Sequence, residues 1–175
     1  MPHRWPWIER HFTFDYPVEK FPDCYERLAG TAPRLSFMLA AVSDEEGARS
    51  DGDGWTIKQN VGHLTDLEYL PETRIDEILE GRETLTAADM ANVATHEATH
   101  NQRPLADLLS EFSVRREALC DRLASLPASD WGRASFHGRI QKPMRLVDLV
   151  YFTAEHDDYH LSRIRALLRW LRGEH

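Results

Sequence analysis

The spacing of large apolar residues restricts the fold more than any other feature of this chain. Between positions 105 and 126 they recur at intervals of three, four and seven: Leu105, Leu108, Leu109, Phe112, Leu119, Leu123 and Leu126. These intervals place the side chains on one stripe of an α-helix, and such a stripe has to be buried against other elements. Strict two-residue alternation, which is typical of a half-buried strand, extends over no more than a few positions. The pattern therefore predicts an all-α protein without a sheet core.

Four amphipathic helices are expected, over residues 23–42, 56–80, 104–126 and 146–170. The second starts with the segment TIKQ at positions 56–59, which fits a capping box, and Gly81 should end it. Pro71 should kink this helix, because proline lacks the N–H that the helix needs. Four helices of this kind predict a four-helix bundle. The connection 81–103 is long for a bundle and predicts at least one crossover.

Length and charge limit the organisation and the partners. The 175 residues suit a single domain, with residues 1–20 as an N-terminal extension that packs on the bundle. In that extension Trp5, Trp7 and Phe12 are expected to cap the bundle, with a dimer contact as the alternative. The net charge of −8 argues against a nucleic-acid partner, which would need clustered lysines and arginines. The one basic cluster is expected to be a solvated helix end: Arg163, Arg165, Arg169 and Arg172.

The compartment follows from three features. No apolar run reaches the roughly 18 residues that a membrane helix needs. The first twelve residues carry charges where a signal peptide would be apolar. Cys24 and Cys120 are too few for a disulfide framework and are expected to be reduced and buried. Together these features predict a cytoplasmic protein that does not span a membrane.

Two histidines occupy the middle of the predicted apolar stripe of the last helix. At about 100° per residue, His156 and His160 fall in the same sector as Leu149, Ile164 and Leu167. A buried imidazole needs partners for its ring nitrogens. Two imidazoles one turn apart can meet that need together by binding one metal ion. The alternative is a pair of core histidines that neighbouring polar side chains satisfy by hydrogen bonds.

His63, in the second predicted helix, is the candidate third ligand. It lies on one flank of the apolar face, between Leu67 and Leu70. Three imidazoles would leave open coordination positions on the metal, as in catalytic rather than structural sites.

A second pair, His96 and His100, forms the motif H-E-x-x-H with Glu97. In metalloproteases this motif places two zinc ligands on one helix face and uses the glutamate as general base. Here the surrounding segment is short, poor in large apolar residues and cut off by Pro104. A metalloprotease is therefore a minor alternative, and the segment is expected in the crossover connection.

The combination of motifs resembles the DinB/YfiT-like metalloprotein superfamily. A tryptophan and a hydroxyl residue open a helix at Trp55-Thr56, Gly62-His63-Leu64 follows, and His156 and His160 give the H-x-x-x-H motif near the C-terminus. The resemblance implies a four-helix bundle with up-down-down-up topology, often a homodimer. It also implies a divalent metal, commonly nickel or zinc, with His63, His156 and His160 as its ligands.

The resemblance further implies a metal-dependent enzyme that acts on a small-molecule substrate. The reaction would be either a transfer that uses a low-molecular-weight thiol or a hydrolysis, and thiol transfer is favoured by analogy. Two other hypotheses stay open: a non-catalytic bundle that binds a small ligand, and a purely structural role for the histidines. Of the acidic residues beside the pair, Glu155, Asp157 and Asp158, most are expected in solvent and one as a partner of a ligand histidine.

Overall fold

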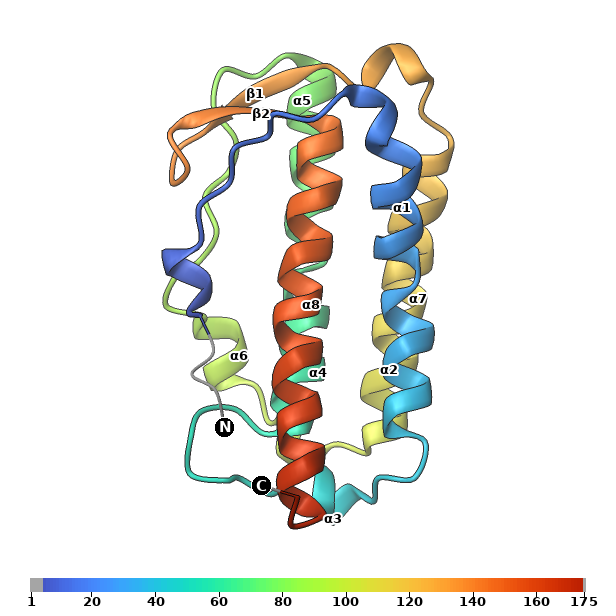
Figure 1. Ribbon diagram of the computed structural model, residues 1–175, viewed down its shortest axis with the longest axis vertical. Coiled ribbons are helices and arrows are strands. Elements are labelled where there is room, and N and C mark those ends of the chain that lie inside the picture. The colour runs from blue at the N-terminus through green and yellow to red at the C-terminus, as the bar shows by residue number, and fades with distance from the viewer. Residues whose placement is uncertain (1–4, 175) are drawn as a thin grey trace.

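Long helices packed side by side form the body of the protein (Figure 1). The computed structural model describes residues 5–174. Its main helices are α1 (Phe21–Ala29), α2 (Thr31–Leu39), α4 (Ile57–Leu67), α5 (Tyr69–Glu80), α7 (Leu105–Ala124) and α8 (Leu146–Leu171). Because α1 continues into α2 and α4 into α5, these six helices form four rods. The predicted helical bundle is confirmed.

Shorter elements connect the rods. Two are helical turns of α type, α3 (Asp44–Gly47) and α6 (Val93–Glu97), and four are 3₁₀ turns: Trp7–Glu9, Val18–Lys20, His100–Gln102 and Ala128–Asp130. Strands β1 (Ala134–His137) and β2 (Lys142–Arg145) pair as an antiparallel hairpin beside the start of α8. The sequence analysis did not predict this hairpin. Each strand has only four residues, which is too short for alternation to be recognised.

The ends and breaks of the second rod follow the local sequence. Thr56 and Gln59 form the predicted capping box, in which each side chain accepts a hydrogen bond from the other residue's backbone N–H at 3.1 Å. The rod breaks at Glu68, since Pro71 cannot donate to the carbonyl of Leu67 and its ring crowds that turn. Gly81 ends the rod in the left-handed conformation, with a φ of 72°. The first rod, predicted as one helix, is interrupted at Gly30.

A buried ionic cluster divides the core into two apolar parts. One part lies towards the hairpin and includes Ile75, Leu119 and Leu149, whereas the other includes Leu64, Phe112 and Ile164. Between them along the helices lie Arg116, Glu68 and Asp157, with exposed fractions of only 1%, 3% and 1%. Arg116 donates to both carboxylates and to the carbonyl of Leu28. Most of the three acidic residues beside the histidine pair were expected in solvent, but Asp157 is buried in this cluster.

The segment before α1 runs along α8 and reaches the hairpin (Figure 1). The ring of Trp7 lies 5.0 Å from that of Phe152 and 5.0 Å from that of His156, while Phe12 is buried in the core. Cys24 and Cys120 are buried free thiols, as expected. Among residues 5–174, no helix is both long and apolar enough to cross a bilayer.

Candidate metal centre

The packing of α4 against α8 brings three histidines together. His63 comes from α4 and His156 and His160 from α8, and one ring nitrogen of each lies within 4.8 Å of the others. His63 and His160 are buried, while His156 is partly exposed. Within residues 5–174, no other group of three or more His, Cys, Asp or Glu side chains converges in this way. The three residues that the sequence singled out are thus neighbours in space.

Asn60 fixes the tautomer of His160. The amide nitrogen of Asn60 donates to the carbonyls of Trp55 and Thr56, at 3.1 and 2.7 Å. Its oxygen therefore faces His160, whose Nδ1 lies 2.8 Å away and must donate. The electron pair of His160 is consequently on Nε2, which points towards His156 Nε2 at 3.2 Å.

A second polar chain fixes His63. The hydroxyl of Thr95 donates to Asp66 at 2.8 Å, so its oxygen is left to accept from His63 Nδ1 at 3.0 Å. His63 therefore also carries its free electron pair on Nε2. His100 contributes from the other side, because its Nε2 lies 2.9 Å from the same carboxylate of Asp66. Hydrogen bonds of this kind orient metal-binding histidines and raise their basicity.

Burial favours the neutral form of two of the three imidazoles, His63 and His156. It lowers the pKa of His63 to about 3, an effect that the nearby His156 reinforces. It lowers the pKa of His156 to about 3 as well, with Arg116 as the next cause. Neutral imidazoles whose electron pairs meet at one point repel each other unless a cation or a proton lies between them. The donor set, the tautomers and the neutrality therefore fit a divalent metal ion.

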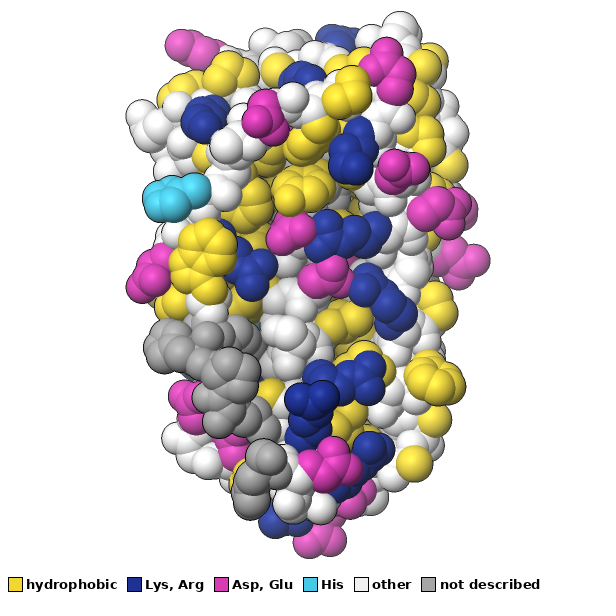
Figure 2. Space-filling model, in the orientation of Figure 1, with side chains coloured by type: hydrophobic (Ala, Val, Ile, Leu, Met, Phe, Trp, Pro, Cys, Tyr) yellow, Lys and Arg dark blue, Asp and Glu magenta, His cyan; other side chains and the backbone are white. Residues whose placement is uncertain are grey.

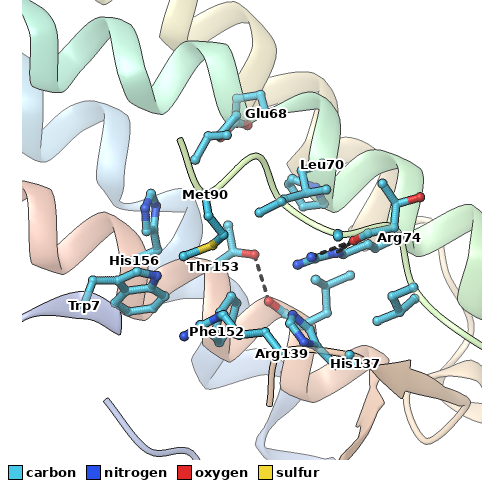
Figure 3. Close-up of a pocket in the computed structure, with 18 of the residues that line it drawn as sticks. Trp7, Glu68, Leu70, Arg74, Met90, His137, Arg139, Phe152, Thr153 and His156 are labelled. Atoms are coloured by element: carbon cyan, nitrogen blue, oxygen red, sulfur yellow. Dashed lines mark hydrogen bonds between the residues drawn. The ribbon is translucent and has the colours of Figure 1, made fainter. Parts of the chain in front are cut away.

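Two cavities meet beside His156. One, of about 410 Å³, also touches His63 and His160 and is bordered by Trp55 and Tyr159. The other, of about 260 Å³, lies on the hairpin side and has mainly apolar walls. Both are lined by Trp7, Leu67, Ala88, Met90 and His156. In Figure 3, His156 and Trp7 lie at one end of the second cavity and Arg74 and His137 at the other.

The sequence profile of the DinB superfamily matches residues 27–164. The chain belongs to the DinB superfamily. Its fold is similar to that of YfiT from Bacillus subtilis, described as a probable metal-dependent hydrolase with an unusual four-helix bundle topology. That likeness has a TM-score of 0.78 at 18% identity and covers 93% of this chain and 94% of YfiT.

A second similar structure is the mycothiol-dependent maleylpyruvate isomerase, with a TM-score of 0.62 at 17% identity. The match covers 86% of this chain but only 61% of the isomerase. At such identities the likeness establishes the shared fold. No curated protein matches the chain.

The H-E-x-x-H segment has no comparable geometry in this DinB fold. Helix α6 ends at Glu97, and Ala98 is extended, with a φ of −69° and a ψ of 143°. His96 is therefore exposed, while His100 is buried against Asp66 on a separate turn. Neither belongs to the converging group found among the described residues. The metalloprotease alternative is not supported, because its two histidines share no helix face.

The acidic residues around the pair have other partners. Glu155 and Asp158 form ion pairs with Arg27 at the surface between α1 and α8, where Figure 2 shows basic and acidic side chains interspersed. None of the hydrogen bonds of Glu155, Asp157 or Asp158 found in residues 5–174 reaches His63, His156 or His160. The hydrogen-bond partners of His160 and His63 are instead Asn60 and Thr95, and the sequence analysis predicted neither. An amide and a hydroxyl on helical segments carry no distinctive spacing.

Arg163 also departs from the expected solvated helix end. It is buried and paired with Asp51 at 2.6 Å, and it lines the larger cavity. The remaining members of that basic cluster are exposed: Arg165, Arg169 and Arg172.

Proposed function

We propose that this chain is a metal-dependent enzyme in which His63, His156 and His160 hold one nickel or zinc ion. The observation that carries the proposal is the convergence of their ring nitrogens within 4.8 Å. Because Thr95 and Asn60 accept from Nδ1 of His63 and His160, the electron pairs of both rings are on Nε2. Imidazole nitrogen is a good donor for both metals.

The reaction we propose is one that a Lewis acid promotes. A divalent ion held by His63, His156 and His160 would supply this chemistry by lowering the pKa of a bound water or thiol, so that the nucleophile could form near neutral pH. The residues of the chain supply the rest of the site. Asn60 and Thr95 hold the imidazoles in position, and the rings of Trp7 and Trp55 shield them from bulk water.

Between the two reactions, transfer of a low-molecular-weight thiol is the first candidate. Two cavities meet beside His156, and this arrangement supports a reaction between two organic molecules. The wider cavity suits the thiol cosubstrate and the apolar one its acceptor. Hydrolysis is the second candidate, supported by the likeness to YfiT over nearly the whole chain.

Metal analysis of tag-free protein, purified without chelator, tests the site. We expect about one equivalent of nickel or zinc in the wild type and almost none in His156→Ala or His160→Ala. His96→Ala is the matched control, because His96 is an exposed histidine outside the cluster, and it should keep the metal. Metal-free wild type that gains no thermal stability from added nickel or zinc would contradict the proposal.

Turnover is tested separately with thiol acceptors and with esters. Metal-loaded wild type should be active on at least one class, and the two histidine variants should be inactive. A metal-loaded protein that binds small molecules without turnover would favour the non-catalytic binding bundle instead.

Three finer features are proposals as well. We propose that the rods run up-down-down-up with the connection 81–103 as the crossover, which the course of the ribbon in Figure 1 supports. The homodimer expected from the family and the cytoplasmic location stay predictions. Size-exclusion chromatography with light scattering tests the first of these two.

A further inference from the structure

The apolar cavity beside His156 ends in a buried cation that has no ion-pair partner within the described residues. Arg74, on α5, is only 3% exposed, and its Nε and Nη2 donate to the carbonyl of Thr86 at 3.0 and 2.8 Å. No ion pair joins it to any carboxylate within residues 5–174. The nearby Glu77 accepts from the backbone and the hydroxyl of Thr86. A buried cation without a carboxylate partner is costly, so a counter-charge from a ligand would stabilise it.

Other buried arginines of this protein show the contrast. Arg116 is bound by Glu68 and Asp157, and Arg163 by Asp51. In the core the chain therefore supplies carboxylates to balance its guanidinium groups. At Arg74 the only hydrogen-bond acceptor in the described residues is a carbonyl oxygen, because Glu77, which attracts the guanidinium from nearby, accepts from Thr86 instead.

His137, on β1, adds an unused donor to the same cavity. The residue is only 4% exposed, and its Nδ1 accepts from the N–H of Ile140 at 3.3 Å. The proton of the neutral ring is therefore on Nε2, which has no hydrogen-bond partner in the described part of the chain. Burial, with Arg74 as the next cause, lowers the pKa of His137 to about 4, which keeps this arrangement at neutral pH. A buried donor without a partner indicates a missing acceptor.

Arg139 places a second positive charge at the rim. It is exposed and also lines the cavity, with its guanidinium 5.6 Å from the ring centre of Phe152 and 6.0 Å from that of Trp7. Within the described residues it forms no ion pair. The carboxylates on the cavity wall, Glu68 and Asp157, are both bound to Arg116. The free charge that faces this cavity is therefore positive.

We propose that this cavity binds an organic carboxylate, with its anionic end at Arg74, His137 and Arg139 and its apolar part against Leu149 and Phe152. The remainder of the molecule would extend to His156 (Figure 3). A carboxylate offers two oxygens in one plane, which suit one imidazole N–H and one guanidinium. The small volume and apolar walls favour it over phosphate, which carries more charge and needs more donors. The proposal names the substrate class of the site described above and depends on that function only for the reacting end.

Calorimetry with phenylacetate and its neutral analogue phenylacetamide tests the anion site. The full-length wild type should bind phenylacetate at least roughly tenfold more tightly than the amide. Arg139→Gln and His137→Phe should each reduce that preference severalfold. Arg165→Gln removes the same charge from an exposed position on α8 and should leave it unchanged. Circular dichroism confirms that each variant is folded.

Several outcomes would overturn the inference. They are equal affinity for the two probes, no measurable binding of phenylacetate, or a preference that survives both variants. Inorganic phosphate that binds as tightly as phenylacetate and displaces it would also contradict the assigned class.

The variant His63→Ala separates this inference from the proposed function. The preference for phenylacetate should persist in it, because Arg74 and His137 are intact. A preference lost in His63→Ala but kept in Arg139→Gln would mean that the carboxylate binds the metal, which overturns the inference and leaves the metal site standing. If the wild type binds no metal but still prefers phenylacetate, the proposed metal site is wrong and the anion site stands.

Discussion

Two histidine pairs with the same spacing have entirely different surroundings in this protein. His156 and His160 lie one turn apart on α8, a helix of 26 residues, and their Nε2 atoms face each other. His96 and His100 are separated by the end of α6, so that one is exposed and the other buried. The spacing acquires chemical meaning only where a continuous helix turns both rings to the same side.

The second pair nevertheless supports the first. His100 binds Asp66, Asp66 accepts from Thr95, and Thr95 in turn accepts from His63. The crossover segment therefore holds one of the proposed ligands in its tautomer without joining the cluster. The four predictions below test how each region is held, from the largest expected effect to the smallest.

Arg116→Met should destabilise the protein by about 3–5 kcal/mol, since it leaves Glu68 and Asp157 buried without their partner. Asp157 follows His156 on α8, so this ionic cluster anchors the helix that carries the first pair. Urea unfolding followed by circular dichroism measures the change. The matched control is Arg115→Met, whose surface ion pair with Glu111 contributes at most about 1 kcal/mol. Similar losses in both variants would show that the buried cluster has no special role.

Asn60→Ala should weaken nickel or zinc binding by roughly ten- to a hundredfold, because His160 loses the acceptor that orients its ring. Competition with a chromophoric chelator gives the affinity. His96→Ala should leave it unchanged. An Asn60→Ala protein with wild-type affinity would mean that the helix alone orients His160.

These two predictions mark the boundary of what the sequence could reveal. Apolar periodicity, the capping box at Thr56 and the kink before Pro71 are local effects, and each was predicted correctly. The proximity of His63, His156 and His160 to one another was also predictable, because the spacing of apolar residues shows which histidines of a helix face inward. Whether they hold a metal stays a prediction.

The remaining features depend on contacts between distant segments. In the sequence, Asp157 looks like a solvent-exposed acid, and its burial depends on the ion pair with Arg116 on α7. Asn60 and Thr95 look like ordinary polar residues until the tautomers of the histidines are considered. His137 and Arg74 gain significance only from the cavity that they share.

Gly62→Ala should cost about 1 kcal/mol, the net of a steric clash and a better helix propensity. A Cβ at this position would lie 2.4 Å from the ring of His100, so that the crossover must move away from α4. Thermal unfolding measures the loss. Gly138→Ala is the control, since a Cβ there meets nothing within 4 Å. An unchanged stability of Gly62→Ala would mean that the segment around His100 shifts without cost.

The pH dependence of stability provides the finest test of how deeply His63, the neighbour of the first pair, is buried. Burial lowers the pKa of His63 from 6.5 to about 3, so below pH 6.5 the unfolded chain binds a proton that the folded chain excludes. The stabilisation is therefore complete above that pH and declines as the pH falls. Between pH 7 and 6 this histidine alone accounts for about 0.7 kcal/mol of lost stability.

Chelator-treated wild type should consequently unfold at lower urea concentration at pH 6 than at pH 7, and His63→Leu should show a smaller difference between the two. The comparison uses metal-free protein, because protons also compete with a bound ion for the imidazoles. Equal differences in both proteins would mean that His63 titrates normally in the fold. The ring would then be open to water, and burial would not keep it neutral. Such a result would reduce the contrast between the two pairs to one of geometry, since burial would no longer distinguish His63 from the exposed His96.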